Sequence, residues 1–545
     1  MLIRLVSPTS GPFPAAWAHV SVLRPSMAHP IRASRLHSVH AARLHHRPRS
    51  RSPRVSLTYI TQIRSFASDV PKARASEGAE TARKLESETD SASSVATSPD
   101  ELDLQKPQVS TVNSTASTDS DLDWEEKPNF RIEKFTELPY QNFGVNQHII
   151  INQEFKEVLR QVLWRFRAPI RYAFAYGSGV FPQSKGDAAT EAEIKAVHPK
   201  APVAVQKAQD GSPKMIDFIF GVSYTQHWHS LNLMQHRDHY SMLGSLGSAA
   251  VSHVQDKSGA GVYFNPYVTV DGILIKYGVV NIDTLCRDLS EWDTLYLAGR
   301  LHKPVKILRD DPRVRLANQI NLLSALRTAL LLLPPTFTEQ ELYATIAGIS
   351  YLGDPRMALP TENPKKVSNI VTHNMLNFRR LYAPLIESLP NVEFDDPVCS
   401  SPDWIANADS VLKIQQDMDP VKRGNMVRRL PKAFRSKLYF EYQKKFQIPQ
   451  LDFNKMMEEN KDEDAVSFKR QQGGGFEQRI AQDEPEALQQ NIRGVIKKTI
   501  TWPSITQSVK GVVTAGFGRS YRYLGEKITK YREADKSEET HDKSS

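Results

Sequence analysis

The residues with the clearest capacity for chemistry lie where two apolar stretches of the chain meet polar groups. The stretch 170–176 runs directly into Gly177-Ser178-Gly179, and the stretch 215–222 is apolar except for Asp217. A glycine lets the backbone approach a phosphate closely, while a serine hydroxyl and successive amide N–H groups donate hydrogen bonds to phosphate oxygens. A carboxylate in an apolar strand is costly to bury unless it is paired or holds a metal ion. These residues predict a site for a polyphosphate and a divalent cation.

Lys276 adds a positive charge to this predicted site. It lies in Ile275-Lys276-Tyr277-Gly278, a stretch with strand character. Magnesium takes oxygen ligands and bridges phosphates, and a lysine amine neutralises charge that develops on phosphate oxygens during a transfer reaction. We therefore predict that Asp217 and Lys276 are catalytic, that Asp217 is the ligand of Mg²⁺, and that Gly177, Ser178 and Gly179 bind a nucleotide.

Simpler explanations compete with these assignments. Gly-Ser-Gly is common in turns, and Lys276 is also compatible with a solvent-facing position on an alternating strand. Asp217 is compatible with a structural position at a strand end. Asp271 is a further acidic candidate, but Asp271-Gly272 between two strand-like stretches is fully explained as a hairpin turn. Asp271 is therefore left out of the predicted site.

The elements that must position these residues indicate an α+β fold with a mixed sheet. Apolar residues recur at helical spacing from Gln153 to Phe166, and strands are expected at 170–176, at 214–222 and on both sides of the Asp271-Gly272 turn. Residues 312–333 have a wide apolar helical face, Thr338 to Glu341 form a helix-capping pattern, and a third helix is expected at 367–386. A mainly helical domain is therefore expected to follow the sheet domain.

A buried strand that ends in Gly-Ser, beside a strand that carries an aspartate, resembles the core of the nucleotidyltransferase fold. That fold usually has two aspartates one residue apart on the second strand. Here the positions two residues before and after Asp217 are Met215 and Ile219. The identity of a second metal ligand therefore stays open.

Composition narrows the class of protein. The chain has 545 residues, 40% of them hydrophobic, with a mean hydropathy of −0.45. No stretch approaches the roughly 20 apolar residues that span a bilayer, so no membrane-spanning helix is expected. Its cysteines, Cys286 and Cys399, are too few for a disulfide framework or a cysteine metal cage, and a reducing compartment fits.

The net charge of +9 is concentrated at the N-terminus. Residues 1–66 contain ten Arg and no Lys, Asp or Glu, so the remaining chain sums to −1. An Arg-rich, acid-free leader is typical of a mitochondrial transit peptide, and Arg64-Ser65-Phe66-Ala67-Ser68 resembles a cleavage site after Phe66. Residues 69–127 instead hold 14 Asp/Glu against 6 Lys/Arg and predict a disordered linker.

The C-terminal region predicts a helix that lies on a membrane surface. Residues 493–532 carry nine Lys/Arg against one acid, and apolar residues recur at helical spacing from Ile505 to Tyr531. A basic amphipathic helix lies in an anionic lipid interface, and Pro503 marks its expected start. A helix that packs on its own protein is the alternative. The predicted organisation is a leader 1–66, a linker 67–135, a nucleotidyltransferase domain 136–310 with an insertion 184–213, a helical domain 311–445, a flexible insertion 446–492, the membrane-binding helix 493–532 and a tail 533–545.

Several longer strings resemble the mitochondrial translocator assembly and maintenance family, the peripheral mitochondrial CDP-diacylglycerol synthases. The resemblance covers roughly residues 140–390 and 495–532. The strings that carry it are Phe174–Phe181, Met215–Phe220, Trp228-His229-Ser230, His239-Tyr240-Ser241, Gly259–Asn265, Ile275–Val279, Leu297–Lys306, Ile349–Asp354 and Lys510–Gly516.

The resemblance implies a fold and a reaction. The implied fold is a nucleotidyltransferase domain, a winged-helix-like domain and a C-terminal membrane-associating helix. The implied reaction joins CTP to phosphatidic acid with Mg²⁺, giving CDP-diacylglycerol and pyrophosphate for cardiolipin synthesis at the matrix side of the mitochondrial inner membrane. A non-catalytic maintenance factor of the protein-import translocase is the alternative. A nucleic-acid substrate is not expected, because the chain after the leader has almost no net charge.

Two further groups of residues are candidates for binding. Arg300, Lys303 and Lys306 form a basic cluster that suits a phosphatidate head group or the triphosphate, although a solvated loop explains them equally well. His227, His229, His236 and His239 invite a zinc interpretation. No cysteine or carboxylate accompanies these histidines at a recognised zinc spacing, so no metal site is expected there.

Overall fold

The computed structural model describes residues 124–126, 132–183, 189–209, 211, 213–358, 363, 365–400, 404–406, 412–459, 474–516, 518–522 and 525. The predicted leader, most of the predicted linker and the predicted tail 533–545 lie outside these residues. The described part of the chain belongs to a single compact unit that starts at Gln105.

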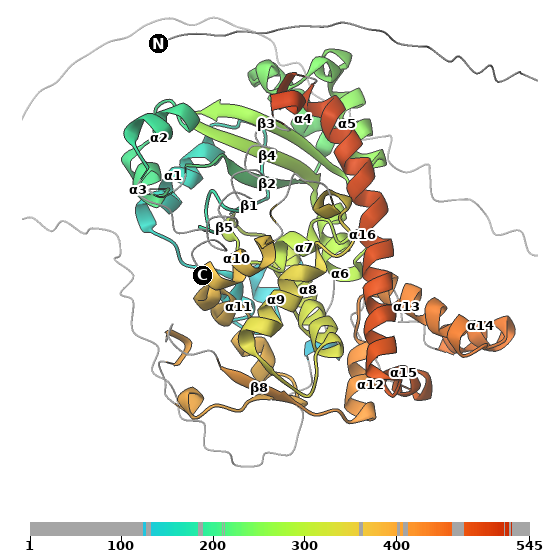
Figure 1. Cartoon of the computed structure of the whole chain (residues 1–545). Coiled ribbons are helices and arrows are strands. Elements are labelled where there is room, and N and C mark those ends of the chain that lie inside the picture. The colour runs from blue at the N-terminus through green and yellow to red at the C-terminus, as the bar shows by residue number, and fades with distance from the viewer. Residues whose placement is uncertain are drawn as a thin grey trace, which may run out of the picture. The chain divides into compact units, whose positions relative to one another are not determined.

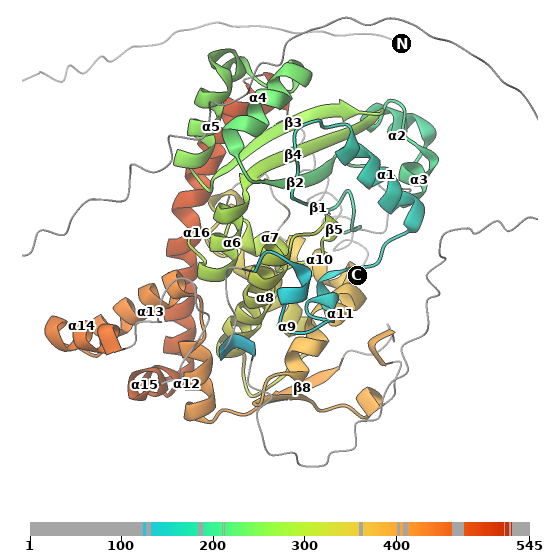
Figure 2. The same ribbon diagram turned by 180° about the vertical axis from the view of Figure 1, so that it is seen from behind.

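A mixed five-stranded sheet forms the framework of the first half of this unit (Figures 1 and 2). The strand order is β3-β4-β2-β1-β5. Strands β2 and β4 run parallel, and the other neighbours run antiparallel. This confirms the predicted α+β class and mixed sheet. The bounds are β1 (Tyr172–Tyr176), β2 (Ile216–Val222), β3 (Val262–Val270), β4 (Ile273–Asn281) and β5 (Lys306–Arg309).

The hairpin between β3 and β4 turns at the predicted dipeptide. Asp271 and Gly272 have φ angles of 49° and 79°, and positive φ at both central residues is what a tight hairpin turn requires. A Cβ on Gly272 would lie 2.5 Å from the Cβ of Lys200, so glycine is needed here for space as well as for conformation. The side chain of Asp271 pairs with Arg165 at 2.6 Å, which is a structural use of this acid.

Helices cover both faces of the sheet. On one face, Phe220 and Tyr277 pack against Trp228 of α4 and against Phe166, which follows α1. On the other face, a Cβ on Gly221 would lie 3.3 Å from Ile282 at the start of α6. The bounds are α1 (Gln153–Trp164), α2 (Glu191–Val197), α3 (Val203–Ala208), α4 (Thr225–Gln235), α5 (Gly247–Lys257), α6 (Ile282–Glu291) and α7 (Ala298–Leu301). Helices α2 and α3 occupy part of the predicted insertion 184–213.

The second half is built around a long buried helix, α8 (Pro312–Leu332), as its apolar pattern predicted. The predicted capping pattern at Thr338 is present, with reciprocal hydrogen bonds to Glu341. The helix expected at 367–386 is two helices that meet at Asn374. The bounds are α9 (Glu339–Ile349), α10 (Lys366–His373), α11 (Met375–Glu387) and a small antiparallel sheet of β6 (Thr336–Thr338), β8 (Lys413–Gln416) and β7 (Val392–Phe394).

The last helices correct one prediction. Helix α16 (Pro485–Ala515) begins at Pro485, and Pro503 lies inside it rather than at its start. Proline suits the first turn of a helix, because backbone N–H groups in that turn have no acceptor within the helix and proline has no N–H to leave unpaired. Helices α14 (Gln450–Glu459) and α15 (Gly475–Ala481) lie within the segment predicted as a flexible insertion, after α12 (Pro420–Arg428) and α13 (Lys432–Lys445). No helix among the described residues is long and apolar enough to span a bilayer.

A buried ion pair ties α11 to the start of α9. Arg379 and Glu339 are both fully buried, and the Arg379 Nε donates to Glu339 Oε2 at 3.0 Å. The same guanidinium donates to the carbonyl oxygen of Trp404 at 3.0 Å. Removing one partner leaves an uncompensated buried charge.

We predict that Arg379→Ala lowers the free energy of unfolding by about 3–5 kcal/mol. The measurement is urea denaturation followed by tryptophan fluorescence. The half-buried neighbour Arg380 provides the control, since Arg380→Ala is expected to change this free energy by less than about 1 kcal/mol. Equal effects of the two variants would show that the ion pair adds nothing to stability.

Candidate active site

A cavity of about 250 Å³ opens beside the end of β1, where both halves of the unit and α16 meet. The predicted residues Gly177, Ser178, Asp217, Lys276, Arg300 and Lys303 all line it. Ser350, Tyr351, Asp354, Arg356 and Lys366 line it from the helical half, and Ile500 and Ser504 line it from α16. The cavity is therefore shared by segments more than 300 residues apart in the sequence.

The turn after β1 exposes its backbone because glycines occupy two restricted positions. Gly177 has a φ of 80°, and its carbonyl oxygen accepts hydrogen bonds from Val180 N and Phe181 N. A Cβ on Gly179 would lie 2.8 Å from the carbonyl oxygen of Met215, which directly precedes β2. The first glycine permits the left-handed turn, and the second permits close packing on β2, so Ser178 is held at the cavity wall.

Strand register places the two predicted catalytic residues side by side. Asp217 on β2 is the register partner of Lys276 on parallel β4 and of Tyr176 on antiparallel β1. The Lys276 Nζ lies 3.4 Å from Asp217 Oδ1 and 4.9 Å from the centre of the Phe264 ring. A Cβ on Gly278 would lie 2.6 Å from that ring, so Gly278 makes room for Phe264 next to the lysine.

The Asp217 carboxylate has the character of a cation ligand. Its Oδ1 atom is buried and, beside the ion pair with Lys276 Nζ at 3.4 Å, accepts no hydrogen bond from the described residues. A carboxylate oxygen that accepts no hydrogen bond in a polar cavity fits a hard cation that takes oxygen ligands. Met215 and Ile219 add no carboxylate, and Asp354 is the other acid among the cavity residues. Arg356 Nε donates to Asp354 Oδ1 at 2.9 Å, so Asp354 is hydrogen-bonded within its ion pair, whereas Lys276 lies at the longer distance of 3.4 Å from Asp217 Oδ1.

Arg300 reaches the cavity from a tightly held helical turn. Asp288 accepts hydrogen bonds from the backbone N–H groups of Leu295, Leu297 and Ala298 at 2.9–3.0 Å, which fixes the start of α7. The Arg300 guanidinium lies 4.1 Å from the centre of the Tyr296 ring, and its Nε donates to the Tyr176 hydroxyl at 3.3 Å. A guanidinium stacked in this way keeps donors available for an anion.

Lys303 is a half-buried amine at the wall shared with the helical half. Its Nζ donates to the Ser350 hydroxyl at 2.8 Å and also to the Gly299 carbonyl. Burial, together with the nearby charges of Arg300 and Lys366, lowers the pKa of Lys303 to about 7. A phosphate bound nearby would counter this repulsion and favour the charged amine.

Lys306, the third member of the predicted basic cluster, lies elsewhere. Its Nζ donates to the carbonyl oxygen of Ile149 at 2.7 Å, and it does not line the cavity. Strand β5 directs this side chain toward the segment before α1. We therefore leave Lys306 out of the candidate site.

Sequence reasoning missed the contribution of the helical half. Ser350 lies so close to Gly299 that a Cβ on that glycine would come within 2.4 Å of the Ser350 Cβ. A Cβ on Gly353 would lie 2.8 Å from the Lys497 backbone of α16. These contacts bring Arg356 and Lys366 to the cavity. The string Ile349–Asp354 contributes to the family resemblance, but its residue types alone do not predict a chemical role for it.

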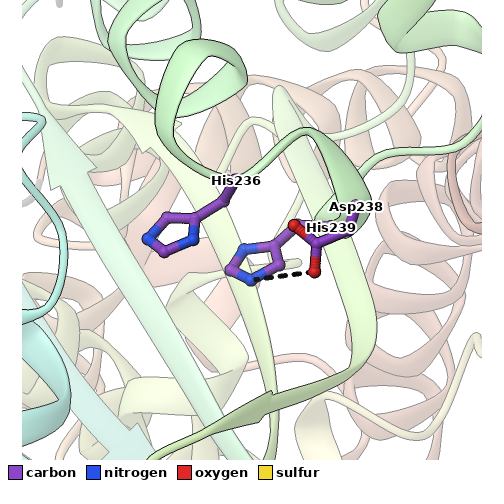
Figure 3. A group of neighbouring side chains, drawn as sticks. All are labelled: His236, Asp238 and His239. Atoms are coloured by element: carbon purple, nitrogen blue, oxygen red, sulfur yellow. Dashed lines mark ion pairs between the residues drawn. The ribbon is translucent and has the colours of Figure 1, made fainter.

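The histidine segment lies on the opposite face of the sheet from Asp217. His236, Asp238 and His239 offer ligand atoms within 4.8 Å of one another, so a carboxylate does accompany the histidines (Figure 3). However, the His236 and His239 rings stack in parallel with centres 4.4 Å apart. His239 Nδ1 already hydrogen-bonds the Tyr277 hydroxyl at 2.8 Å. Stacked rings do not converge on one ion, and we assign no metal to this group.

Comparison with known proteins places the chain in a family. A family model described as "Phosphatidate cytidylyltransferase, mitochondrial" matches residues 159–530. A protein of that name from Xenopus laevis is 37% identical over 383 residues, which cover 68% of this chain and 93% of the relative. Its Schizosaccharomyces pombe counterpart is 36% identical over 385 residues, covering 71% and 86%, and that of Saccharomyces cerevisiae is 42% identical over 260 residues, covering 47% and 62%.

The matched residues include every residue that lines the cavity, and the similarity to the Xenopus laevis protein extends over nearly the full length of that relative. The chain belongs to the mitochondrial phosphatidate cytidylyltransferase family.

Proposed function

We propose that this chain transfers a cytidylyl group from CTP to phosphatidate, giving CDP-diacylglycerol and pyrophosphate. The observation that carries the proposal is the pairing of Asp217 with Lys276 beside the Gly177-Ser178 turn, in a family of that name. A non-catalytic maintenance factor would not need an aspartate–lysine pair in a polar cavity beside a Gly-Ser turn. The geometry therefore favours the enzyme.

The reaction is an in-line displacement at the α-phosphorus of CTP. A phosphatidate oxygen forms a new bond to this phosphorus, and the bond to the oxygen that bridges the α- and β-phosphates breaks, so pyrophosphate leaves with the electron pair. The nucleophile is already an anion and needs no strong base. The protein must therefore align two anionic substrates and neutralise their charge.

The cavity residues suit this task. The Ser178 hydroxyl and the backbone of the Gly177 turn bind the triphosphate, and Lys276 neutralises charge on it. Asp217 would hold Mg²⁺, which when bound supplies further positive charge to the phosphates. Arg300 and Lys303, joined by Arg356 and Lys366, receive the phosphatidate head group or the outer phosphates of CTP.

The proposal also covers the fold of each half of the unit and the location of the protein in the cell. The Gly-Ser turn and the Asp217 strand support a nucleotidyltransferase fold for the sheet half. Helices α9 to α11 with the small β6-β8-β7 sheet support a winged-helix-like second half. The acid-free leader 1–66 and the relatives' names support a mitochondrial location, and a bilayer substrate supports a peripheral position on the matrix side of the inner membrane.

Helix α16 is the proposed link to the membrane, because its polarity reverses along its length. Up to Ile500 its buried face is apolar, with Leu488, Ile492, Val495 and Ile496. Beyond Pro503 the buried residues are polar, namely Ser504, Gln507, Lys510 and Thr514. The exposed face of this later part is apolar, with Trp502, Ile505, Val509, Val512 and Val513 between 37% and 70% exposed. An outward apolar face of this kind suits an interfacial helix.

The polar inner face also explains how α16 stays attached. Gln507 donates to the Val262 carbonyl at 3.1 Å, and the Lys510 Nζ donates to the Ser258 carbonyl at 2.6 Å. Packing on its own protein and binding to a membrane are therefore compatible, on opposite faces. Lys510, counted among the basic residues of the predicted membrane helix, belongs to the inner face.

We predict that Asp217→Asn abolishes formation of CDP-diacylglycerol while the unfolding temperature stays unchanged, because the neutral amide no longer holds the cation. The assay incubates residues 67–545 with labelled CTP, Mg²⁺ and phosphatidate liposomes. Asp271→Asn is the control and keeps its activity. If Asp217→Asn retains activity within about threefold of the wild type, its role as metal ligand is wrong.

Lys276→Ala is expected to lower turnover by at least about tenfold, because one charge-neutralising group commonly contributes about 2–4 kcal/mol. Initial rates at saturating CTP and phosphatidate give this value. The exposed Lys200, near the tip of the β3–β4 hairpin, supplies the matched control Lys200→Ala. Unchanged kinetics for Lys276→Ala would make its contact with Asp217 purely structural.

The membrane role of α16 is tested best by substitution, because truncation after Gln490 would also remove buried residues such as Ile492 and Ile496. We expect Val509→Gln with Val513→Gln to weaken binding to cardiolipin-containing vesicles by at least about tenfold, since two exposed apolar side chains no longer enter the lipid. Co-sedimentation is the measurement, and wild-type binding is expected to weaken with salt. Val421→Gln, on α12, is the control. Undiminished binding by the double variant would place the membrane contact elsewhere.

A further inference from the structure

A short segment of the sheet half exposes apolar side chains that its own fold does not use. The 3₁₀ turn η5 (Met242–Leu246) follows α4. Within it, Leu243 packs against the cluster of Tyr240, Val251 and Tyr263. Met242 and Leu246, four residues apart, are instead 88% and 71% exposed. The segment is thus anchored by one side chain while two large apolar side chains project into solvent.

This turn is fixed directly to the outer end of α16. The Ser241 hydroxyl donates to the Val513 carbonyl at 3.0 Å and accepts a hydrogen bond from the backbone N–H of Leu243 at 3.3 Å. Arg519, just beyond α16, donates to the carbonyl oxygens of Asp238 and His239 at 2.7 and 2.9 Å. Figures 1 and 2 both show the end of α16 beside α4 and α5. The apolar face of α16 and the exposed side chains of η5 therefore lie at the same end of the unit.

We propose that η5 and the end of α16 form one composite surface that docks on an anionic phospholipid bilayer, with Met242 and Leu246 inserted as a second anchor. The proposal rests on the proposed function for the presence of a bilayer substrate. It assigns to the sheet half a membrane contact that the predicted C-terminal helix did not include.

Charge at this end favours an anionic lipid surface over an apolar protein partner. Residues 237–246 and 518–522 contain three arginines, Arg237, Arg519 and Arg522, against one acid, Asp238. Net positive charge beside inserted apolar side chains attracts anionic lipid head groups while the apolar groups enter the acyl boundary.

The second anchor also has a geometric consequence for the cavity. Ser504 lines the cavity, and Val513 is bonded to Ser241. Val513 lies nine positions beyond Ser504 on the helix, a rise of about 13.5 Å. A protein held at the membrane by α16 alone could turn about the axis of that helix, whereas a second contact through η5 fixes this orientation. The docked surface thus sets which side of α16, and hence which side of the cavity, faces the lipid.

The test is co-sedimentation of full-length mature protein with vesicles of phosphatidylcholine and cardiolipin. We expect Met242→Ser with Leu246→Ser to reduce the fraction bound by at least about tenfold, with an unchanged unfolding temperature. Leu451→Ser is the matched control. Leu451 is 67% exposed on α14, which lies near the opposite end of α16 (Figures 1 and 2).

Each outcome is informative. Vesicle binding equal to that of the wild type overturns the proposal. A wild-type dimer that the double variant converts to a monomer, with vesicle binding unchanged, identifies the surface as a contact between copies and also overturns it. Vesicle binding requires no turnover, so an enzymatically inactive chain would refute the proposed function and leave this measurement interpretable.

Discussion

The parallel register of β2 with β4 is the constraint on which the candidate site depends. It sets Asp217 opposite Lys276, and the antiparallel pairing with β1 sets the Gly177 turn at the same edge. A slip of one residue would turn both charged side chains to the face packed under α4. Apolar residues that alternate with them, such as Phe218 and Tyr277, are fully buried on that face, so the hydrophobic core enforces the register that the chemistry requires. The packing that stabilises the sheet therefore also fixes the position of Asp217 relative to Lys276.

Local signals in the sequence were sufficient for the sheet half of the site. The Asp271-Gly272 turn, the single acid in an apolar strand and the glycine-serine junction are each properties of a few adjacent residues, and they lie at a hairpin turn, on β2 and at the end of β1. Lys306 shows that closeness in the sequence does not by itself place a side chain in the same site. It was grouped with Arg300 and Lys303 because they are close in the sequence, but α7 ends at Leu301 and β5 carries the Lys306 side chain to Ile149. Arg356 and Lys366 reach the cavity through contacts between distant segments, and such contacts leave no local pattern in a single sequence.

Helix α16 combines packing on its own protein with the membrane contact proposed for it. Its first half has the polarity of an ordinary core helix, and its second half is reversed, with polar side chains inward and apolar ones outward. The reversal begins next to Ile500 and Ser504, the residues of α16 that line the cavity. A sequence pattern alone records that apolar residues recur at helical spacing, but it does not say which face the protein covers. The sequence therefore leaves packing on the protein and binding to lipid as alternatives, and only the buried residues of α16 show that the two can use opposite faces.

The position of the reversal bears on how a substrate with two long acyl chains reaches a polar cavity. In the proposed reaction a phosphatidate head group must leave the interface far enough to meet Lys276 and Arg300, while its chains stay in an apolar environment to avoid the cost of hydrating them. The outward face of α16 starts at Trp502, within one turn of the cavity wall at Ile500 and Ser504, so the apolar and polar environments adjoin there. Because the loop at Gly353 packs directly against α16 at Lys497, the basic residues Arg356 and Lys366 are coupled to the same helix. Any tilt that the proposed membrane contact imposed on α16 would therefore act on the position of the cations that line the cavity.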